Sequence, residues 1–281
     1  MKLSLEVHVM RERYGDAKAI EMLHKAGFDA VDYSFYYLKK SPNRDAIIGN
    51  GYLEHAHQVR RLLDEKGMVC NQAHAPFDMT RDDAMDESNE NFLEIVHAME
   101  AAAIMGAPMI VVHAPTADID YDIEYYRSLE PYCKRFGIKV AVENLFLRPN
   151  FTSRLGTPDE LNQVLAALDP AHFCACLDVG HAQLTYRDPA GFIAGVLPGR
   201  IECFHIQDND LESDSHLLPY LAKMDWDSII SSIAAIGFNR DITLELVAFL
   251  QKFPTEETMQ AALNLCASVG RNIISRIEAA R

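Results

Sequence analysis

Short apolar runs alternate with longer amphipathic segments along the chain. Residues 3–8 form the first run, in which every second residue is apolar, as in a β-strand with one buried face. Residues 16–26 then carry apolar side chains at helical spacing, and Gly27 follows where a helix would end. This strand-then-helix order recurs to the last residues, so the pattern predicts a β/α protein.

The later elements follow from the same pattern. Further strands are expected at 29–34, 68–74, 108–113, 139–143, 172–178, 200–205 and 241–246. Further helices are expected at 53–66, 91–105, 120–136, 226–236 and 256–279, with two more starting at Thr157-Pro158 and Asp188-Pro189. The helices before the second to fifth strands each end at a glycine, as a helix C-cap followed by a tight turn requires.

Eight strands alternating with eight helices predict an α/β fold, a single (β/α)8 TIM barrel formed by one domain over residues 1–281. An open doubly wound sheet is the alternative. It is disfavoured because no glycine-rich phosphate loop follows the first strand. In addition, metal-competent side chains end six of the strands, and these would diverge on a flat sheet but converge on the axis of a barrel.

The six strand-end side chains suggest a metal site. They are His74, His113, Glu143, Asp178, His205 and Glu245. Taken singly, each is more typical of a hydrogen-bonded rim or core residue. Together at one end of a barrel, their three carboxylates would repel one another unless a cation lay between them. Mixed carboxylate and imidazole ligands suit Mn²⁺, Mg²⁺, Co²⁺ or Zn²⁺, so we expect a divalent ion.

Composition narrows the function. The 281 residues are 49% hydrophobic with a formal net charge of −15, which supports a full core and argues against a nucleic-acid partner. No apolar stretch is long enough for a membrane span and no basic-then-apolar leader follows Met1, so a cytoplasmic protein is expected. The six cysteines lack a paired CxxC spacing, and we interpret them as small buried hydrophobes in a reducing compartment.

Four stretches of sequence carry a family resemblance. VENLF contains Glu143, CLDVGHAQL contains Asp178 and His181, FHIQDND contains His205, and Glu245 lies on the last predicted strand. Together they resemble the xylose-isomerase-like TIM barrel superfamily, in particular its sugar phosphate isomerase/epimerase branch. The resemblance spans nearly the whole chain.

The resemblance implies roles for these residues. In the ketose 3-epimerases of that branch, the positions matching Glu143, Asp178, His205 and Glu245 bind one divalent metal ion. The two glutamates also form the acid/base pair, and the histidine matching His181 contacts a substrate oxygen. The expected activity is therefore that of a metal-dependent isomerase or epimerase of a sugar, keto-sugar or sugar phosphate, acting through an enediolate, with manganese among the expected metals. A small-molecule sugar partner and a homo-oligomer are further expectations.

Two departures keep other functions open. The epimerases carry an arginine about six residues beyond the strand-seven histidine, where this chain has Leu211. Asp214 and His216 form a DxH pair after the same strand. Zinc-dependent apurinic endonucleases of the superfamily use nine ligands for three metals, and matching positions exist here, namely His74, His113 and Glu143; Glu143 again with Asp178, His205 and Glu245; and His181, Asp214 and His216.

The endonuclease reading has three points against it. The net charge is wrong for a DNA-binding surface, the loops after the first two strands lack Arg/Lys clusters, and the sequence after His113 is Ala-Pro where that family has Pro-Gly. A metal-dependent sugar or inosose lyase, which shares the enediolate step, and a non-catalytic binding subunit are the remaining alternatives. The sequence does not identify the sugar, its phosphorylation, the number of metals or the oligomeric state.

Two further segments bear on substrate binding. The aromatic, turn-rich residues 35–52 suggest either a loop over the pocket or a surface excursion packed on the barrel wall. Arg148, five residues beyond Glu143, is a candidate for binding a phosphate or carboxylate group of the substrate, although an exposed loop arginine is the commoner situation.

Overall fold

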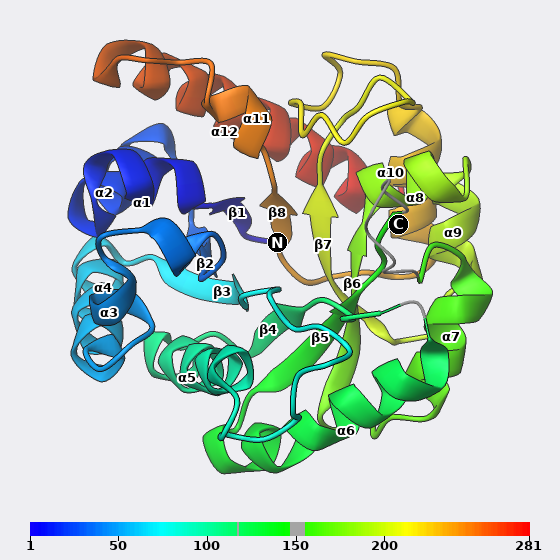
Figure 1. Cartoon of the computed structure of the whole chain (residues 1–281). Helices are drawn as coiled ribbons and strands as arrows, with labels where there is room; N and C mark the ends of the chain where they lie inside the picture. The colour runs from blue at the N-terminus through cyan, green and yellow to red at the C-terminus, as the bar shows by residue number, and fades with distance from the viewer. Residues whose placement is uncertain (117, 147–154) are drawn as a thin grey trace.

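A closed barrel of eight parallel strands forms the centre of the molecule, with the helices around it (Figure 1). The computed structural model describes residues 1–116, 118–146 and 155–281. Arg148 lies outside these described residues. The strands follow one another around the barrel in sequence order, and β1 closes the barrel by pairing with β8. They are β1 (Leu3–Glu6), β2 (Ala30–Ser34), β3 (Val69–His74), β4 (Met109–Val112), β5 (Lys139–Glu143), β6 (Phe173–Asp178), β7 (Ile201–Ile206) and β8 (Ile242–Leu244).

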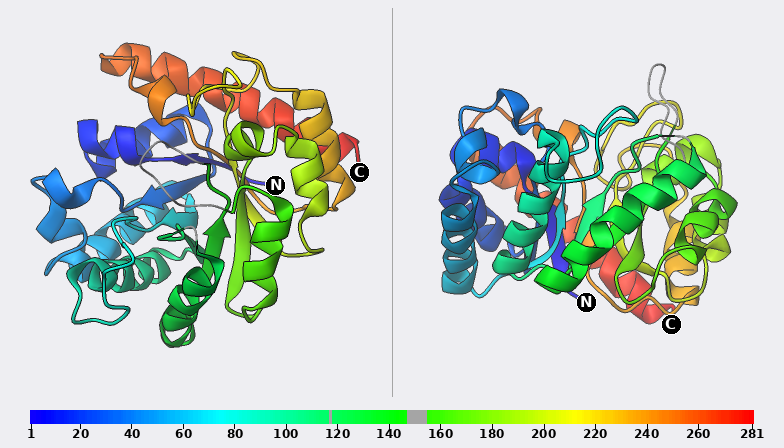
Figure 2. Two further views of the ribbon diagram at one scale, coloured as in Figure 1. Left: turned by 45° about the vertical axis from the view of Figure 1, so that its right-hand side comes forward. Right: turned by 60° about the horizontal axis from the view of Figure 1, so that its bottom comes forward.

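Helices surround the barrel in both further views (Figure 2). Those of the regular repeat are α2 (Asp16–Ala26), α4 (Tyr52–Lys66), α5 (Glu90–Met105), α6 (Ile119–Phe136), α7 (Pro158–Ala166), α9 (Pro189–Gly195), α10 (Trp226–Ala235) and α12 (Glu256–Ala279). Shorter ones are α1 (His8–Tyr14), η1 (Leu38–Lys40), α3 (Arg44–Ile47), α8 (Val179–Thr185) and α11 (Val247–Leu250). The predicted TIM barrel is confirmed. Among the described residues, no helix is both long enough and apolar enough to cross a membrane.

The short helices that follow strands were not predicted. The sequence pattern extends the first strand to His8, but His8 begins α1, and β8 ends at Leu244, two residues earlier than expected. In both places the alternation of apolar residues continues into a segment that turns away from the sheet. The glycine caps, by contrast, are confirmed, because Gly27 and Gly106 have φ angles of 93° and 94°, which glycine adopts without strain.

Alternation along the strands divides the core into two parts. Residues facing the helices join one large apolar cluster that includes Val140, Val142, Leu177 and Phe204. A second, small cluster of strand residues with the opposite parity consists of Met109, Val111, Ala141, Cys174, Cys176 and Cys203. All six cysteines are buried and free, as expected. The candidate ligands of these strands have the same parity as the second cluster, so their side chains point to the same face of the sheet.

Candidate active site

The candidate ligands lie at the C-terminal ends of strands. The inward-facing residues that precede them on these strands are small. Glu143 lies two residues beyond Ala141, Asp178 two beyond Cys176, and His205 two beyond Cys203. Successive side chains on a strand point to opposite faces, so residues two apart share a face. These three polar side chains therefore point into the barrel axis, where each is at most 1% exposed.

The ligands predicted from the resemblance do meet. One nitrogen or oxygen atom from each of Glu143, Asp178, His205 and Glu245 lies within 4.8 Å of the others. His205 Nδ1 lies 2.9 Å from Glu143 Oε1 and 3.4 Å from Glu245 Oε2. All four side chains are buried. We refer to these four residues as the central group.

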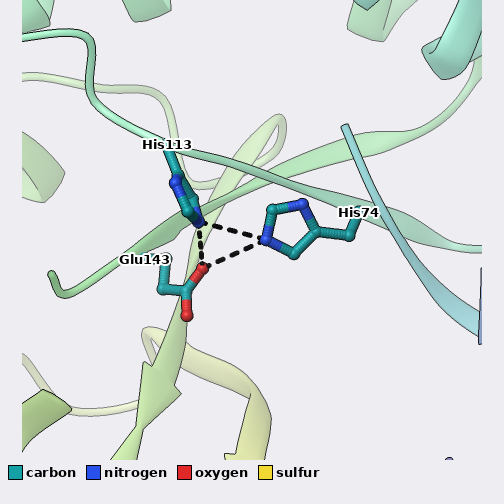
Figure 3. Close-up of side chains that lie close together, drawn as sticks. All are labelled: His74, His113 and Glu143. Carbon is teal, nitrogen blue, oxygen red and sulfur yellow. Dashed lines mark hydrogen bonds and ion pairs between the residues drawn. The ribbon is translucent and has the colours of Figure 1, made fainter. Parts of the chain in front are cut away.

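A second group shares Glu143 with the first. His113 Nε2 lies 2.8 Å from Glu143 Oε2, and His74 Nε2 lies 3.4 Å from the same oxygen (Figure 3). The two imidazole Nε2 atoms are 3.1 Å apart. Figure 3 shows all three side chains converging from neighbouring strands on one point. Glu143 thus has one oxygen in each group.

A third group consists of His181 on α8, which follows β6, and of Asp214 and His216 on the loop after β7. His181 Nε2 lies 3.5 Å from Asp214 Oδ1, and His216 Nε2 lies 3.1 Å from Asp214 Oδ2. From the sequence, the members of both outer groups other than Glu143 are candidates for substrate binding or for additional metal ions. The structure brings all nine candidate residues into these three adjacent groups.

The central group fits a divalent cation. His205 Nδ1 faces two carboxylates at once, and Glu245 Oε2 is buried without a hydrogen-bond partner among the described residues. Buried charges require a partner, and an unpaired carboxylate oxygen at the end of a barrel is costly. Three carboxylates and one imidazole are suitable ligands for Mn²⁺, Mg²⁺, Co²⁺ or Zn²⁺. The donor set and the unpaired oxygen therefore both fit a bound ion.

The two glutamates have opposite electrostatic environments. Burial by itself would raise the pKa of Glu143, but the adjacent His205 and His113 outweigh it and hold this pKa well below its ordinary value. Burial raises the pKa of Glu245, and the neighbouring carboxylates of Glu143 and Asp178 add to the effect against the opposing histidines. Such a divergence is typical of a base and an acid that share one site.

The histidines of the outer groups also differ. Burial opposes the charged imidazole everywhere, yet Asp178 and Asp214 outweigh it and raise the pKa of His181 to about 10. His216 lies near Glu245 and Asp214, which raise its pKa to about 9 despite burial. His113 shows the reverse, since burial lowers its pKa to about 4. At neutral pH His181 and His216 are thus charged, whereas His113 is a neutral imidazole whose Nε2 faces the Glu143 carboxylate.

A cavity of about 390 Å³ opens above these groups. Its volume lies within the range of small-ligand pockets. Glu143, Glu245 and members of both outer groups line it, together with Tyr36, Tyr37 and Phe77. The two tyrosines come from the aromatic segment after β2, which therefore borders the pocket, while Phe35 and Tyr36 of the same segment are buried against the barrel. Phe77 stacks on His113, with ring centroids 4.9 Å apart.

The comparison that decides the family concerns nearly the whole chain. Residues 20–268 match the profile of the family described as xylose isomerase-like TIM barrel. The chain belongs to this family.

Known proteins similar to this xylose isomerase-like barrel share its fold at low sequence identity. The uncharacterized protein y4fM of Sinorhizobium fredii (strain NBRC 101917 / NGR234) is 24% identical, over 82% of this chain and 81% of that protein. A D-tagatose 3-epimerase-like protein has a TM-score of 0.75 at 18% identity, covering 99% of this chain and 100% of that one.

Two more solved structures have the same architecture. D-psicose 3-epimerase from Clostridium cellulolyticum H10, solved with D-tagatose, has a TM-score of 0.73 at 14% identity, covering 98% of this chain and 99% of that one. The 3-keto-D-glucoside 4-epimerase YcjR from E. coli has a TM-score of 0.72 at 17% identity, covering 97% and 99%. At these identities the similarity establishes the fold.

Two supporting residues of this xylose isomerase-like barrel were not predicted from the sequence. Gln207 Nε2 donates to Asp178 Oδ2 at 3.2 Å and to Asp214 Oδ1 at 3.0 Å, which joins the central group to the third group. Asp32 Oδ2 lies 3.3 Å from His205 Nε2. The available signals were strand parity for Gln207, which is two residues beyond His205, and charge for Asp32, which is the one charged residue of β2.

Proposed function

We propose that this protein is a divalent-metal-dependent isomerase or epimerase of a sugar, keto-sugar or sugar phosphate that acts through an enediolate, with Glu143 and Glu245 as its acid/base pair. The observation that carries the proposal is the position of the two glutamates. Their carboxylates approach His205 Nδ1 from two strands, at 2.9 Å and 3.4 Å, and both line the same cavity. A substrate in that cavity would contact both.

Glu143, Asp178, His205 and Glu245 would hold the metal ion, for which we favour Mn²⁺. Bound there, the ion would supply Lewis-acid stabilisation of negative charge on substrate oxygens. These four residues offer only carboxylate oxygen and imidazole nitrogen as ligand atoms. The cysteines near the barrel axis belong to the small apolar cluster and not to this group, so the group is not a closed structural zinc site with thiolate ligands.

The protein's own groups account for the proton transfers. One glutamate removes the proton from the carbon next to the substrate carbonyl, which leaves an enediolate. The other returns a proton to the opposite face of that carbon, which inverts it, or to the adjacent carbon, which moves the carbonyl. His181, charged at neutral pH, is placed to donate a hydrogen bond to a substrate oxygen at the cavity wall.

A substrate screen tests the proposal. Keto-sugars, inososes and their phosphates would be incubated with the protein and Mn²⁺ in deuterated water, and exchange at the carbon next to the carbonyl followed by NMR and mass spectrometry. We expect at least one substrate to exchange and to yield an isomer or epimer. Exchange followed by net loss of water would indicate a lyase. No exchange with any substrate in the Mn²⁺-loaded protein would contradict the proposal.

A metal-dependent hydrolase of the apurinic-endonuclease type is the second candidate. The observation that favours it is that all nine side chains assemble into three groups, each compact enough to hold an ion. The net charge of −15 weighs against a DNA-binding surface. Cleavage of an abasic-site duplex by the zinc-loaded protein, without exchange of carbon-bound protons in any sugar, would favour this candidate.

We also propose the setting of the enzyme. The acidic net charge and the six free, buried cysteines support a cytoplasmic protein with a small-molecule sugar as its partner and no nucleic acid. A homo-oligomer is proposed on the basis of the family resemblance, and light scattering in solution would test it.

A further inference from the structure

The interior of the barrel is polar on one side. On β4 to β7 the small apolar cluster fills the space below the ligands. On β1, β2, β3 and β8 the inward space instead holds fully buried polar side chains, among them Ser4, Asp32, Gln72 and Thr243, each 0% exposed. A barrel interior is ordinarily filled by branched apolar residues. Buried polar groups are costly unless they are hydrogen-bonded, so this side of the barrel requires an explanation.

A β-bulge brings two neighbouring side chains to the same point. On β3, Cys70 pairs with Val31 and Gln72 pairs with Asp32, which leaves Asn71 as an extra residue. Consecutive strand residues ordinarily point to opposite faces, but a bulge redirects one of them. Here Asn71 Nδ2 donates to Thr243 Oγ1 at 3.1 Å, and Thr243 Oγ1 donates to Gln72 Oε1 at 3.0 Å. Both side chains thus contact one hydroxyl group.

The hydrogen bonds form a chain with one direction. Ser4 Oγ donates to Asn71 Oδ1 at 2.7 Å, and the chain continues through Thr243 to Gln72. The threonine hydroxyl has a single proton, which it gives to Gln72 Oε1 because it accepts from Asn71. The amide nitrogen of Gln72 therefore faces Asp32, and it donates to Asp32 Oδ2 at 3.0 Å. The chain ends on a carboxylate that can only accept.

Asp32 Oδ2 has one further neighbour. His205 Nε2 lies 3.3 Å away, within ion-pair distance, and this nitrogen has no hydrogen-bond partner among the described residues. Asp32 and Gln72 are both fully buried, so no solvent competes for these positions. The opposite ring nitrogen, Nδ1, faces Glu143 and Glu245 in the central group.

We propose that Asp32, held by the hydrogen-bond chain from Ser4 to Gln72, is a positioning residue that fixes the proton of His205 on Nε2 and thereby presents Nδ1 as the metal-binding atom. This inference rests on the metal site of the proposed function. It goes beyond that function, because neither Asp32 nor the four residues of the hydrogen-bond chain contact the substrate cavity. The second partner of a ligating histidine orients the ring and fixes its tautomer, and its loss typically weakens metal binding about 10- to 100-fold.

Metal binding to matched variants tests the inference. Calorimetry with Mn²⁺ would compare the wild type, Asp32→Asn, and Glu6→Gln as the control. Glu6 is a buried carboxylate and the register neighbour of Asp32, but its described hydrogen bonds come from His8 N and Ser34 Oγ. We expect Asp32→Asn to raise the Kd for Mn²⁺ about 10- to 100-fold and Glu6→Gln to leave it unchanged. Equal weakening in both variants, or none in Asp32→Asn, would overturn the inference.

A spectroscopic measurement separates positioning from a merely structural role. In zinc-loaded protein with ¹⁵N-labelled histidine, His205 should show a downfield, hydrogen-bonded Nε2–H signal, assigned by its loss in His205→Gln. The signal should move upfield in Asp32→Asn. Its absence from the wild type would contradict the inference.

The remaining outcomes are distinguishable. If Asp32→Asn fails to fold, Thr243→Val can replace it, because this variant interrupts the hydrogen-bond chain without a change of charge. Weaker Mn²⁺ binding by Thr243→Val is then the expected result. Unchanged binding would contradict the inference. Absence of Mn²⁺ binding to the wild type would contradict both this inference and the proposed function. Mn²⁺ binding that depends on Asp32, without turnover of any sugar, would remove only the proposed function.

Discussion

Asn144 and Asp178 exchange two hydrogen bonds across adjacent strands. Asn144 Nδ2 donates to the Asp178 carbonyl at 2.9 Å, and the Asp178 amide donates to Asn144 Oδ1 at 2.8 Å. Both residues are fully buried. Asp178 ends β6, so the side chain of Asn144 takes the place of the strand partner that its backbone has lost. This exchange sets the position from which the Asp178 carboxylate reaches the central group.

Replacement of this asparagine should therefore destabilise the fold. Asn144→Ala leaves a buried amide and a buried carbonyl of Asp178 unpaired, and each such group costs about 1–3 kcal/mol. Urea unfolding should show a loss of about 2–5 kcal/mol in total. Asn264→Ala on the outer face of α12 is the control and should cost little. A loss in Asn144→Ala no larger than in the control would show that water replaces the asparagine.

Two aspartates near the start of α6 should respond to pH in opposite directions. Burial raises the pKa of Asp122 to about 7, although Thr116 donates to it twice. The Asp122 carboxyl therefore ionises at a lower pH in the unfolded chain than in the folded protein. Its contribution to stability is greatest below about pH 4 and is lost as the pH rises towards 7. Asp122→Asn should gain stability relative to the wild type across this window, by up to about 1.4 kcal/mol per pH unit.

Asp118 provides the control of opposite sign. It is partly buried, and the hydrogen bond from the Tyr121 amide lowers its pKa. Its contribution to stability is present at neutral pH and is lost in acid. The free energy of unfolding of Asp118→Asn should therefore differ from that of the wild type at neutral pH and approach it as the pH falls. Urea unfolding from about pH 2 to 8 measures both variants. Parallel curves for Asp122→Asn and the wild type would contradict the predicted titration.

Gly180 leaves room for Gln207. A Cβ at Gly180 would lie 2.5 Å from Gln207 Cδ, so an alanine would displace the amide that donates to both Asp178 and Asp214. We expect Gly180→Ala to weaken Mn²⁺ binding about 10- to 100-fold, as the loss of an outer-shell partner does. Calorimetry of the folded variant measures the Kd.

Gly270, on α12 at its contact with β1, is the control for that substitution. A Cβ at Gly270 would lie 2.4 Å from Leu3 Cδ1 in the apolar core. Gly270→Ala should cost about 1–3 kcal/mol of stability through overpacking and leave the Mn²⁺ affinity of the folded protein unchanged. Equal effects of the two substitutions on affinity would show that Gln207 has no specific role.

The number of metal ions should be one. Elemental analysis and anomalous scattering should find an ion between Glu143, Asp178, His205 and Glu245, with the two outer groups empty or weakly filled. The central group offers three carboxylates to a cation, whereas each outer group has only one, so the central group should bind a divalent ion most tightly. His216→Ala and His74→Ala should leave the stoichiometry at one. Three fully occupied zinc ions would favour the hydrolase candidate instead.

The sequence predicted the barrel, and the placement of the candidate ligands on one face, for one physical reason. Inward residues alternate strictly along short strands, so Glu143, Asp178 and His205 could be assigned to one face from the pattern alone. The turn signals were equally local, since a glycine cap or Thr157-Pro158 depends only on neighbouring residues.

The supporting contacts could not be predicted in the same way. The partners of Asp32 lie on β3 and β7, and contact with them depends on the strand register and on a bulge at Asn71 that leaves no mark in the apolar pattern. The short helices α1 and α8 were missed because each begins within one or two residues of a strand, where periodicity has too few residues to change.

The central claim is that Glu143 and Glu245 act as acid and base on opposite faces of one sugar. Glu143→Gln and Glu245→Gln each keep an oxygen that can bind a metal but lose the basic carboxylate. Turnover should fall by about 10²- to 10⁴-fold in each, the range for loss of a positioned acid or base. For an epimerase, the remaining glutamate can still remove the proton on its own side.

Deuterium exchange into each of the two epimers tests this claim most directly. Incubated with Mn²⁺ in deuterated water, Glu143→Gln should wash deuterium into one epimer only, Glu245→Gln into the other only, and the wild type into both, as followed by NMR. Exchange by either variant at a near wild-type rate would contradict the account. So would a wild-type protein that exchanges no carbon-bound proton and instead cleaves abasic DNA.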